Sequence, residues 1–270
     1  MNSDDDITHM EIYKGNYYNK KRNKSSGRVI AFDLDETLGS FSDLEILWSA
    51  LQCFTKEYEP INFNSILDLY PEFLRYGIMN ILEYLHYKKK RGEFIGVYIY
   101  TNNQIGKHWS RMIINYLETK IEISGLFNQI INAFKINTNI IEPLRKSNNK
   151  TRSDFIRCSL LPRNTELCFI DDTHYTQMKH NKVYYIQPKP FFHGLKTGDI
   201  IQRLMDSSIL KTNNDELFRS YFLENNEVIC LDNYFSSNKS NIIHLTSNLY
   251  FEMVRHDITQ PYFAEVHQQP

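Results

Sequence analysis

The chain has 270 residues, of which 41% are hydrophobic and 23% charged, a composition that supports a packed core and excludes global disorder. Its formal net charge of −1 provides no overall positive field of the kind that attracts nucleic acid. The longest apolar run, residues 94–100, is much shorter than the roughly 20 residues that a membrane-spanning helix needs.

The first 27 residues are polar and end in a basic run followed by turn-forming residues. The acidic start, residues 1–6, does not fit the basic n-region of a signal peptide. The four cysteines lie far apart, which is typical of reduced thiols. We therefore expect a flexible tail over 1–27 and an intracellular, cytoplasmic protein, and the basic run leaves a nuclear location open.

Short apolar runs alternate with segments of helical spacing over most of the chain, a pattern that predicts strands alternating with helices. The expected strands are 29–32, 94–100, 129–133, 167–170 and 183–186, and the expected helices include 78–90, 104–119 and 150–161. This order predicts an α/β fold, a Rossmann-like three-layer parallel sheet with helices on both faces, over residues 28–200. Residues 42–75 should form a small helical cap-like insertion, and 201–270 a mainly helical C-terminal extension that packs on the core.

Three polar clusters each follow a predicted buried strand: 33–37, 101–103 and 171–173. Because ligands of open α/β sheets bind outside the carboxyl ends of the strands, we expect the three clusters to converge. Their carboxylates would repel one another, and a hard cation such as Mg²⁺ would offset that repulsion. Taken singly, each cluster could instead cap a helix or hold a turn.

In this order the clusters resemble the four motifs of the haloacid dehalogenase (HAD) superfamily over roughly residues 28–190. Residues 29–38 resemble the first motif, Thr101 the second, Lys150 the third, and 171–172 the fourth. The tetrad 35–38 is similar to the NLI-interacting-factor-like branch of phosphatases, which includes the CTD phosphatases, whereas Asn102, Asn103 and Asp172 depart from that branch.

The resemblance implies a Mg²⁺-dependent phosphomonoester hydrolase that works through an aspartyl-phosphate intermediate. Asp33 would be the nucleophile and Asp35 the general acid and base. Thr101, Asn102 and Lys150 would contact the substrate, with Thr101 and Lys150 also taking part in catalysis. Mg²⁺ would be held by four aspartates: Asp33, Asp35, Asp171 and Asp172. Asp35 would bind through its backbone carbonyl and Asp171 through water.

Several alternatives stay open at this point. Lys146 competes with Lys150 as the motif lysine. The phosphorylated substrate could be a phosphoprotein, a nucleotide or a small metabolite, and a lid formed by 42–75 would favour a small one. A catalytically silent HAD-fold binding or scaffold protein is the alternative of another class. We expect no membrane partner. A nucleic-acid partner is not expected from the net charge but stays open, as does the oligomeric state.

Overall fold

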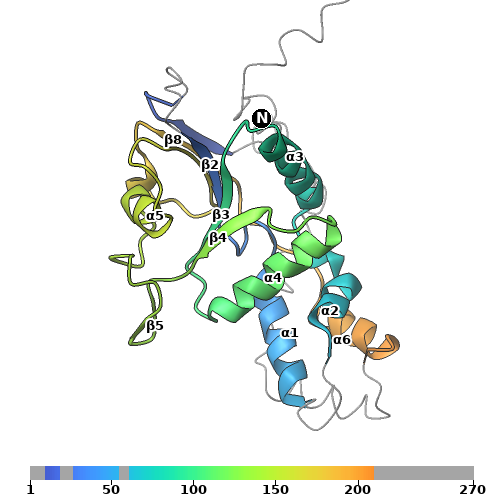
Figure 1. Cartoon of the computed structure of the whole chain (residues 1–270). Helices are drawn as coiled ribbons and strands as arrows, with labels where there is room; N and C mark the ends of the chain where they lie inside the picture. The colour runs from blue at the N-terminus through green and yellow to red at the C-terminus, as the bar shows by residue number, and fades with distance from the viewer. Residues whose placement is uncertain (1–9, 19–26, 55–60, 210–270) are drawn as a thin grey trace, which may run out of the picture.

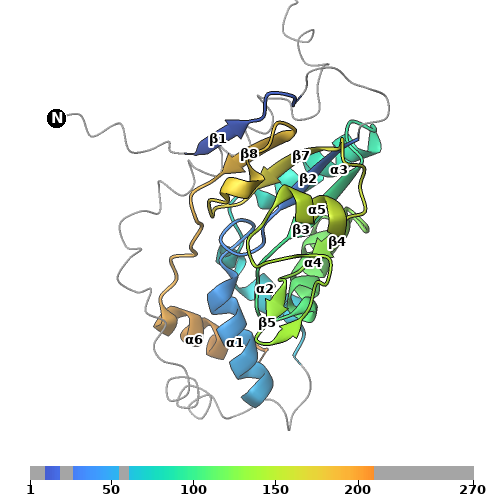
Figure 2. The ribbon, with the colours of Figure 1, turned by 90° about the vertical axis from the view of Figure 1, so that its left-hand side faces the viewer.

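A computed structural model of the protein describes residues 10–18, 27–54 and 61–209. Its centre is a six-stranded sheet (Figure 1). The strand order is β1-β8-β7-β2-β3-β4, as Figure 2 shows. Five strands are parallel, and β1 pairs antiparallel with β8 at one edge. The strand bounds are Glu11–Lys14 (β1), Arg28–Phe32 (β2), Gly96–Tyr100 (β3), Phe127–Ile131 (β4), Glu166–Ile170 (β7) and Val183–Gln187 (β8). The predicted α/β class with a mostly parallel sheet is confirmed.

Side chains of the central strands are buried on both faces of the sheet, which explains why their sequences are continuous apolar runs. In β2, Ile30 and Phe32 belong to one apolar cluster, whereas Val29 and Ala31 belong to a second cluster on the opposite face. The second cluster includes Phe155 of α5 (Arg152–Cys158), so α5 covers that face. Figure 2 shows α5 on its side of the sheet.

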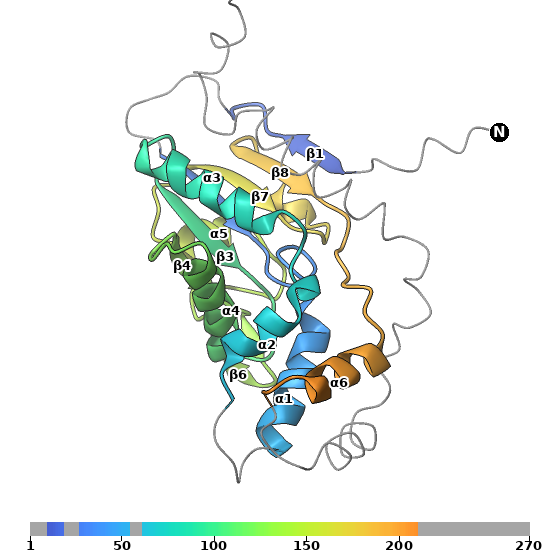
Figure 3. The ribbon, with the colours of Figure 1, turned by 90° about the vertical axis from the view of Figure 1, so that its right-hand side faces the viewer.

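The remaining α-helices contribute to the first cluster. Figure 3 shows α3 and α4 on this face and shows α1, α2 and α6 gathered at one end of the molecule. Their bounds are Phe41–Phe54 (α1), Phe63–Leu69 (α2), Ile78–Lys90 (α3), Lys107–Lys120 (α4) and Thr197–Asp206 (α6), with short 3-10 helices η1 at Pro71–Phe73 and η2 at Thr176–Met178.

The expected helical insertion at 42–75 contains α1, α2 and η1. Leu44 and Leu51 of α1 and Ile66 of α2 are fully buried in the same cluster as Phe32 of the sheet. The insertion therefore contributes to the main core.

Two small elements differ from the sequence expectation. β1 lies within the stretch expected to be a tail, and it escaped notice because only Tyr13 of its four residues is even half-buried. The hairpin of β5 (Lys135–Ile136) and β6 (Asn139–Ile140) was not predicted either, because two-residue strands show no alternation of polar and apolar residues. The C-terminal extension beyond α6, from residue 210, and most of the N-terminal tail lie outside the described residues. Among the described residues, no helix combines the length and apolar character needed to cross a membrane.

Candidate functional site

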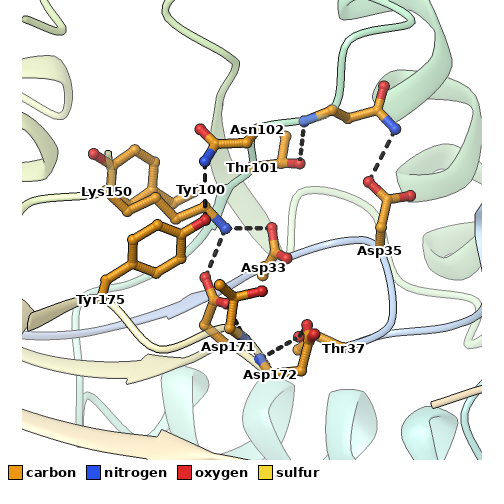
Figure 4. Close-up of polar contacts among 12 residues, drawn as sticks. Asp33, Asp35, Thr37, Tyr100, Thr101, Asn102, Lys150, Asp171, Asp172 and Tyr175 are labelled. Atoms are coloured by element: carbon orange, nitrogen blue, oxygen red, sulfur yellow. Dashed lines mark hydrogen bonds and ion pairs between the residues drawn. The ribbon is translucent and has the colours of Figure 1, made fainter. Parts of the chain in front are cut away.

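The three polar clusters converge at the carboxyl ends of β2, β3 and β7. β2 pairs with both β3 and β7, so the residues that follow these strands become neighbours. Asp33 follows β2 and its backbone N–H donates to Ile170 O at 2.8 Å, while Thr101 follows β3. Asp171 and Asp172 follow β7. Figure 4 shows their side chains around a common centre.

Lys150 is the cation at this centre. Its Nζ lies 2.5 Å from Oδ1 of Asp33 and 2.6 Å from Oδ2 of Asp171, and its side chain is 1% exposed. Burial alone would lower the pKa of Lys150, but the carboxylates of Asp171 and Asp33 raise it above its ordinary value, so the ammonium stays protonated. The competing Lys146 is exposed, so the structure brings Lys150 to the carboxylates.

The start of α5 holds Lys150 in place. The side chain of Thr151 accepts a hydrogen bond from the backbone N–H of Asp154 at 3.0 Å and thereby caps the helix. Aromatic rings surround the Lys150 ammonium at 5.4–5.9 Å from their centres, those of Tyr100, Phe169 and Tyr175. A capped helix end and an aromatic enclosure therefore fix the ammonium before any ligand arrives.

Three of the four predicted metal ligands lie together. Asp33, Asp171 and Asp172 each offer a carboxylate oxygen, and these oxygens are within 4.8 Å of one another, a spacing that could hold a metal ion. Asp172 is oriented by Thr37, whose Oγ1 donates to its Oδ1 at 2.8 Å. The side chain of Asp35 is not part of this group. The chemistry of three converging carboxylates fits a hard cation.

Asp35 and its neighbour Glu36 are carboxyl groups with altered acidity. Asn103 Nδ2 donates to Oδ2 of Asp35 at 2.9 Å. Burial, and then the charge of Asp33, raises the pKa of Asp35 to about 6. Burial, and then the charges of Asp35 and Asp172, raises the pKa of Glu36 to about 7. Both groups can therefore gain or lose a proton near neutral pH.

Several of the site residues, though not Asp171 or Asp172, line an open pocket of about 360 Å³, a size suited to a small ligand. Its walls are mainly polar, and one wall includes the apolar side chain of Ile105. The lining residues are Asp33, Asp35, Glu36, Ser42, Glu45, Thr101, Asn102, Asn103, Gln104, Ile105, Lys150, Thr173 and Tyr175.

Asn102 and Thr101 are held by Arg145, a fully buried residue that the sequence analysis did not single out. Arg145 Nη1 donates to Thr101 O at 2.9 Å, and Nη2 donates to Oδ1 of Asn102 at 2.6 Å. Asn102 Nδ2 in turn donates to the Tyr175 hydroxyl at 3.0 Å. Arg145 and Tyr175 were missed as site residues, whereas Glu36 and Asn103 lie in the predicted clusters 33–37 and 101–103 but were given no role there. No local spacing marks Arg145 and Tyr175, because their partners at the site are distant in the sequence.

Comparison with known proteins gives short matches only. UDP-glucuronic acid decarboxylase 1 of Arabidopsis thaliana is 50% identical over 42 residues, which is 16% of this chain and 10% of that protein. UDP-glucuronic acid decarboxylase 6 of the same plant is 49% identical over 45 residues, 17% of this chain and 13% of that protein. The chain thus spans about a tenth of the length of the curated relatives it matches. No protein-family model matches the chain, and no solved structure matches it.

These findings contradict the assignment to the HAD superfamily and to its NLI-interacting-factor-like branch. The matching curated proteins are decarboxylases, and no phosphatase family model matches the chain. The same matches contradict three further predictions. These are the Mg²⁺-dependent hydrolase with an aspartyl-phosphate intermediate, the silent HAD-fold alternative, and Mg²⁺ as the cofactor of that reaction. Carboxylates, a threonine and a lysine at the strand ends of an α/β sheet suit several reactions, so their spacing indicated where a site lies without fixing its chemistry.

Proposed function

We propose that this chain binds a sugar nucleotide in the pocket at the carboxyl ends of β2, β3 and β7 and acts on its sugar. Two observations support the substrate class. The matched relatives are named for decarboxylation of UDP-glucuronic acid. The pocket lies where open α/β sheets bind their ligands, and a nucleotide was among the substrates left open by the sequence.

The charge of the site limits how a diphosphate could approach. The pocket region contains six carboxyl groups, while its buried ammonium, that of Lys150, is already engaged by two of them. The carboxyl groups belong to Asp33, Asp35, Glu36, Glu45, Asp171 and Asp172. A divalent cation held by Asp33, Asp171 and Asp172 would offset this charge and so allow a diphosphate to approach. The predicted ligand roles of these aspartates are kept in this form as part of the proposal.

The observation that carries the proposal is the position of Asp35. Its carboxyl group lines the pocket, is held by Asn103, and has a pKa of about 6. A carboxyl group poised near neutral pH can pass a proton to or from a sugar hydroxyl or carboxyl group, as most modifications of a sugar require. Thr101, Asn102 and Lys150 would position the ligand around it.

The expected intracellular, cytoplasmic location is kept as part of the proposal. Among the described residues, Cys158 and Cys168 are buried free thiols, as expected of a protein in a reducing compartment.

Calorimetric titration of the full chain with UDP-glucuronic acid tests the proposal, with Mn²⁺ present in one series and EDTA in another. We expect binding with Mn²⁺ and a large loss of affinity in EDTA. Asp172→Asn should weaken the Mn²⁺-dependent binding, whereas Asp206→Asn, an exposed control on α6, should not. Chromatography of the incubated nucleotide then reports any change in its sugar. Absence of binding by UDP-glucuronic acid and by UDP in both series would contradict the proposal.

A further inference from the structure

Glu36 has an unusual backbone for a residue with a side chain. Its φ of +54° lies in the left-handed region, which is free of strain only for glycine. Among the described non-glycine residues with positive φ, which are Glu36, Glu122, Asn137 and Leu160, Glu36 alone lines the acidic pocket. A strained backbone conformation persists only where neighbouring groups hold it, and such conformations cluster at functional sites.

Arg75 maintains this conformation. Its Nη2 donates to Glu36 O at 2.6 Å and its Nε donates to Thr37 O at 2.6 Å. The same Nη2 donates to Lys189 O at 2.8 Å, and the guanidinium lies over the ring of Phe191. Arg75 is 2% exposed, so these carbonyls compete with no solvent for its donors. The Phe191 backbone N–H adds a second hydrogen bond to Glu36 O at 2.8 Å.

The Glu36 side chain, which extends from this backbone, lines the pocket. The carboxylate accepts a hydrogen bond from the Ser42 hydroxyl at 3.2 Å, on the exposed side of the site. Both Glu36 and Ser42 line the pocket beside Asp35. An ionised carboxylate has about four acceptor sites, so Glu36 retains sites beyond the one that Ser42 uses and can accept from a ligand there.

We propose that Glu36 is a substrate-contacting residue, whose carboxylate accepts hydrogen bonds from ligand hydroxyls, and that Arg75 is the positioning residue that holds its backbone left-handed. The contact with substrate rests on the proposed function. The positioning by Arg75 does not, because it concerns only the protein's own groups.

The first test measures, without a ligand, whether Arg75 holds the backbone of Glu36 in place. Arg75→Lys keeps the charge but loses the forked donors, so we expect a fall in melting temperature and faster hydrogen exchange at the Phe191 amide. Adding Glu36→Gly should shrink both effects, because glycine adopts this φ without support. If Arg75→Lys does not fold, recovery of folding by Glu36→Gly gives the same result. Equal effects of Arg75→Lys in the two backgrounds would overturn the positioning role.

The second test measures the contact, using UDP-glucuronic acid with Mn²⁺ as the probe. Glu36→Gly should keep or raise the melting temperature while the affinity falls at least about tenfold. The matched control is Glu122→Gly, since Glu122 has the same φ of +54° at the exposed end of α4, and it should leave the affinity unchanged. An unchanged affinity in Glu36→Gly, with binding by the wild type, would refute the contact alone. Absence of binding by the wild type would refute the proposed function and the contact with it, while the first test still decides the role of Arg75.

Discussion

The Nζ of Lys150 lies 2.6 Å from Oδ2 of Asp171, and neither side chain is more than 1% exposed. This ion pair joins the start of α5 to the end of β7 across the candidate site. Both groups have lost their hydration, so each depends on the other for compensation. The pair therefore stabilises the arrangement of the pocket, and its integrity can be measured as stability of the whole protein.

Replacement of Lys150 by methionine tests that dependence. Lys150→Met leaves Asp33 and Asp171 buried without their cation, and we expect the free energy of unfolding at neutral pH to fall by about 3–5 kcal/mol. Lys120→Met is the control, because Lys120 pairs with Asp68 at 2.6 Å on the exposed surface. That variant should lose less than about 1 kcal/mol. Urea denaturation measures both, and similar losses would show that the buried pair has no special role.

The raised pKa of Asp35 predicts a pH-dependent effect of Asp35→Asn. Between its ordinary pKa of 3.8 and about 6, the folded protein binds this proton while the unfolded chain has released it. Wild-type stability therefore contains a contribution that declines as pH rises through this window. At about pH 7 we expect Asp35→Asn to be more stable than the wild type by about 1–3 kcal/mol, and at about pH 4 the difference should nearly vanish.

The control for this comparison is Glu83→Gln, an exposed position on α3, which should show no such pH-dependent difference. Urea midpoints at both pH values give the result. A constant advantage of Asp35→Asn at every pH would mean that the carboxyl group is not protonated in the folded protein within this window.

Arg145 should be essential to the loop that carries Thr101 and Asn102. Arg145→Met removes the donors of four hydrogen bonds and leaves backbone carbonyls buried without partners, among them those of Thr101 and Asn132. We expect the free energy of unfolding to fall by about 2–4 kcal/mol. Arg163→Met, at an exposed position, should change it by less than about 0.5 kcal/mol. Chemical denaturation measures the free energy of unfolding of both variants. Equal losses in the two would contradict the structural role of Arg145.

The cap of α5 gives a smaller and more local effect. Thr151→Ala removes the oxygen that accepts from the Asp154 N–H, and we expect a loss of about 1 kcal/mol in the free energy of unfolding. Thr151→Ser retains that oxygen and should stay close to the wild type. Thermal unfolding of the wild type and both variants measures these stabilities. If Thr151→Ser were as unstable as Thr151→Ala, the loss would come from the missing methyl group and not from the missing cap.

Features of the site that depend on strand ends could be predicted from the sequence. Asp33, Thr101 and Asp171 each follow an apolar run, and parallel pairing of those runs suffices to bring them together. The sequence favoured Lys150 as the lysine of the site but left Lys146 as an alternative, because the burial of Lys150 depends on the packing of α5.

Features that depend on contacts between distant segments could not be predicted. Arg75 binds carbonyls at positions 36, 37 and 189, and nothing in its local sequence distinguishes it from an exposed arginine. The type of reaction could not be predicted from the sequence either. The motif spacing reports the placement of carboxylates, whereas the chemistry depends on the ligand that they meet, and the comparisons contradict the phosphatase inferred from it.

The short strand β1 has a consequence for anyone who shortens this chain. Its backbone pairs with β8 along four residue pairs, from Glu11 with Gln187 to Lys14 with Tyr184 (Figure 2). A chain that begins at Gly27 would contain every residue of the acidic pocket but would leave the β8 edge uncovered. Unpaired backbone groups beside Tyr185 and Ile186 form a surface to which another molecule can add a strand. Aggregation of such a chain would report the loss of edge protection and would carry no information about the pocket.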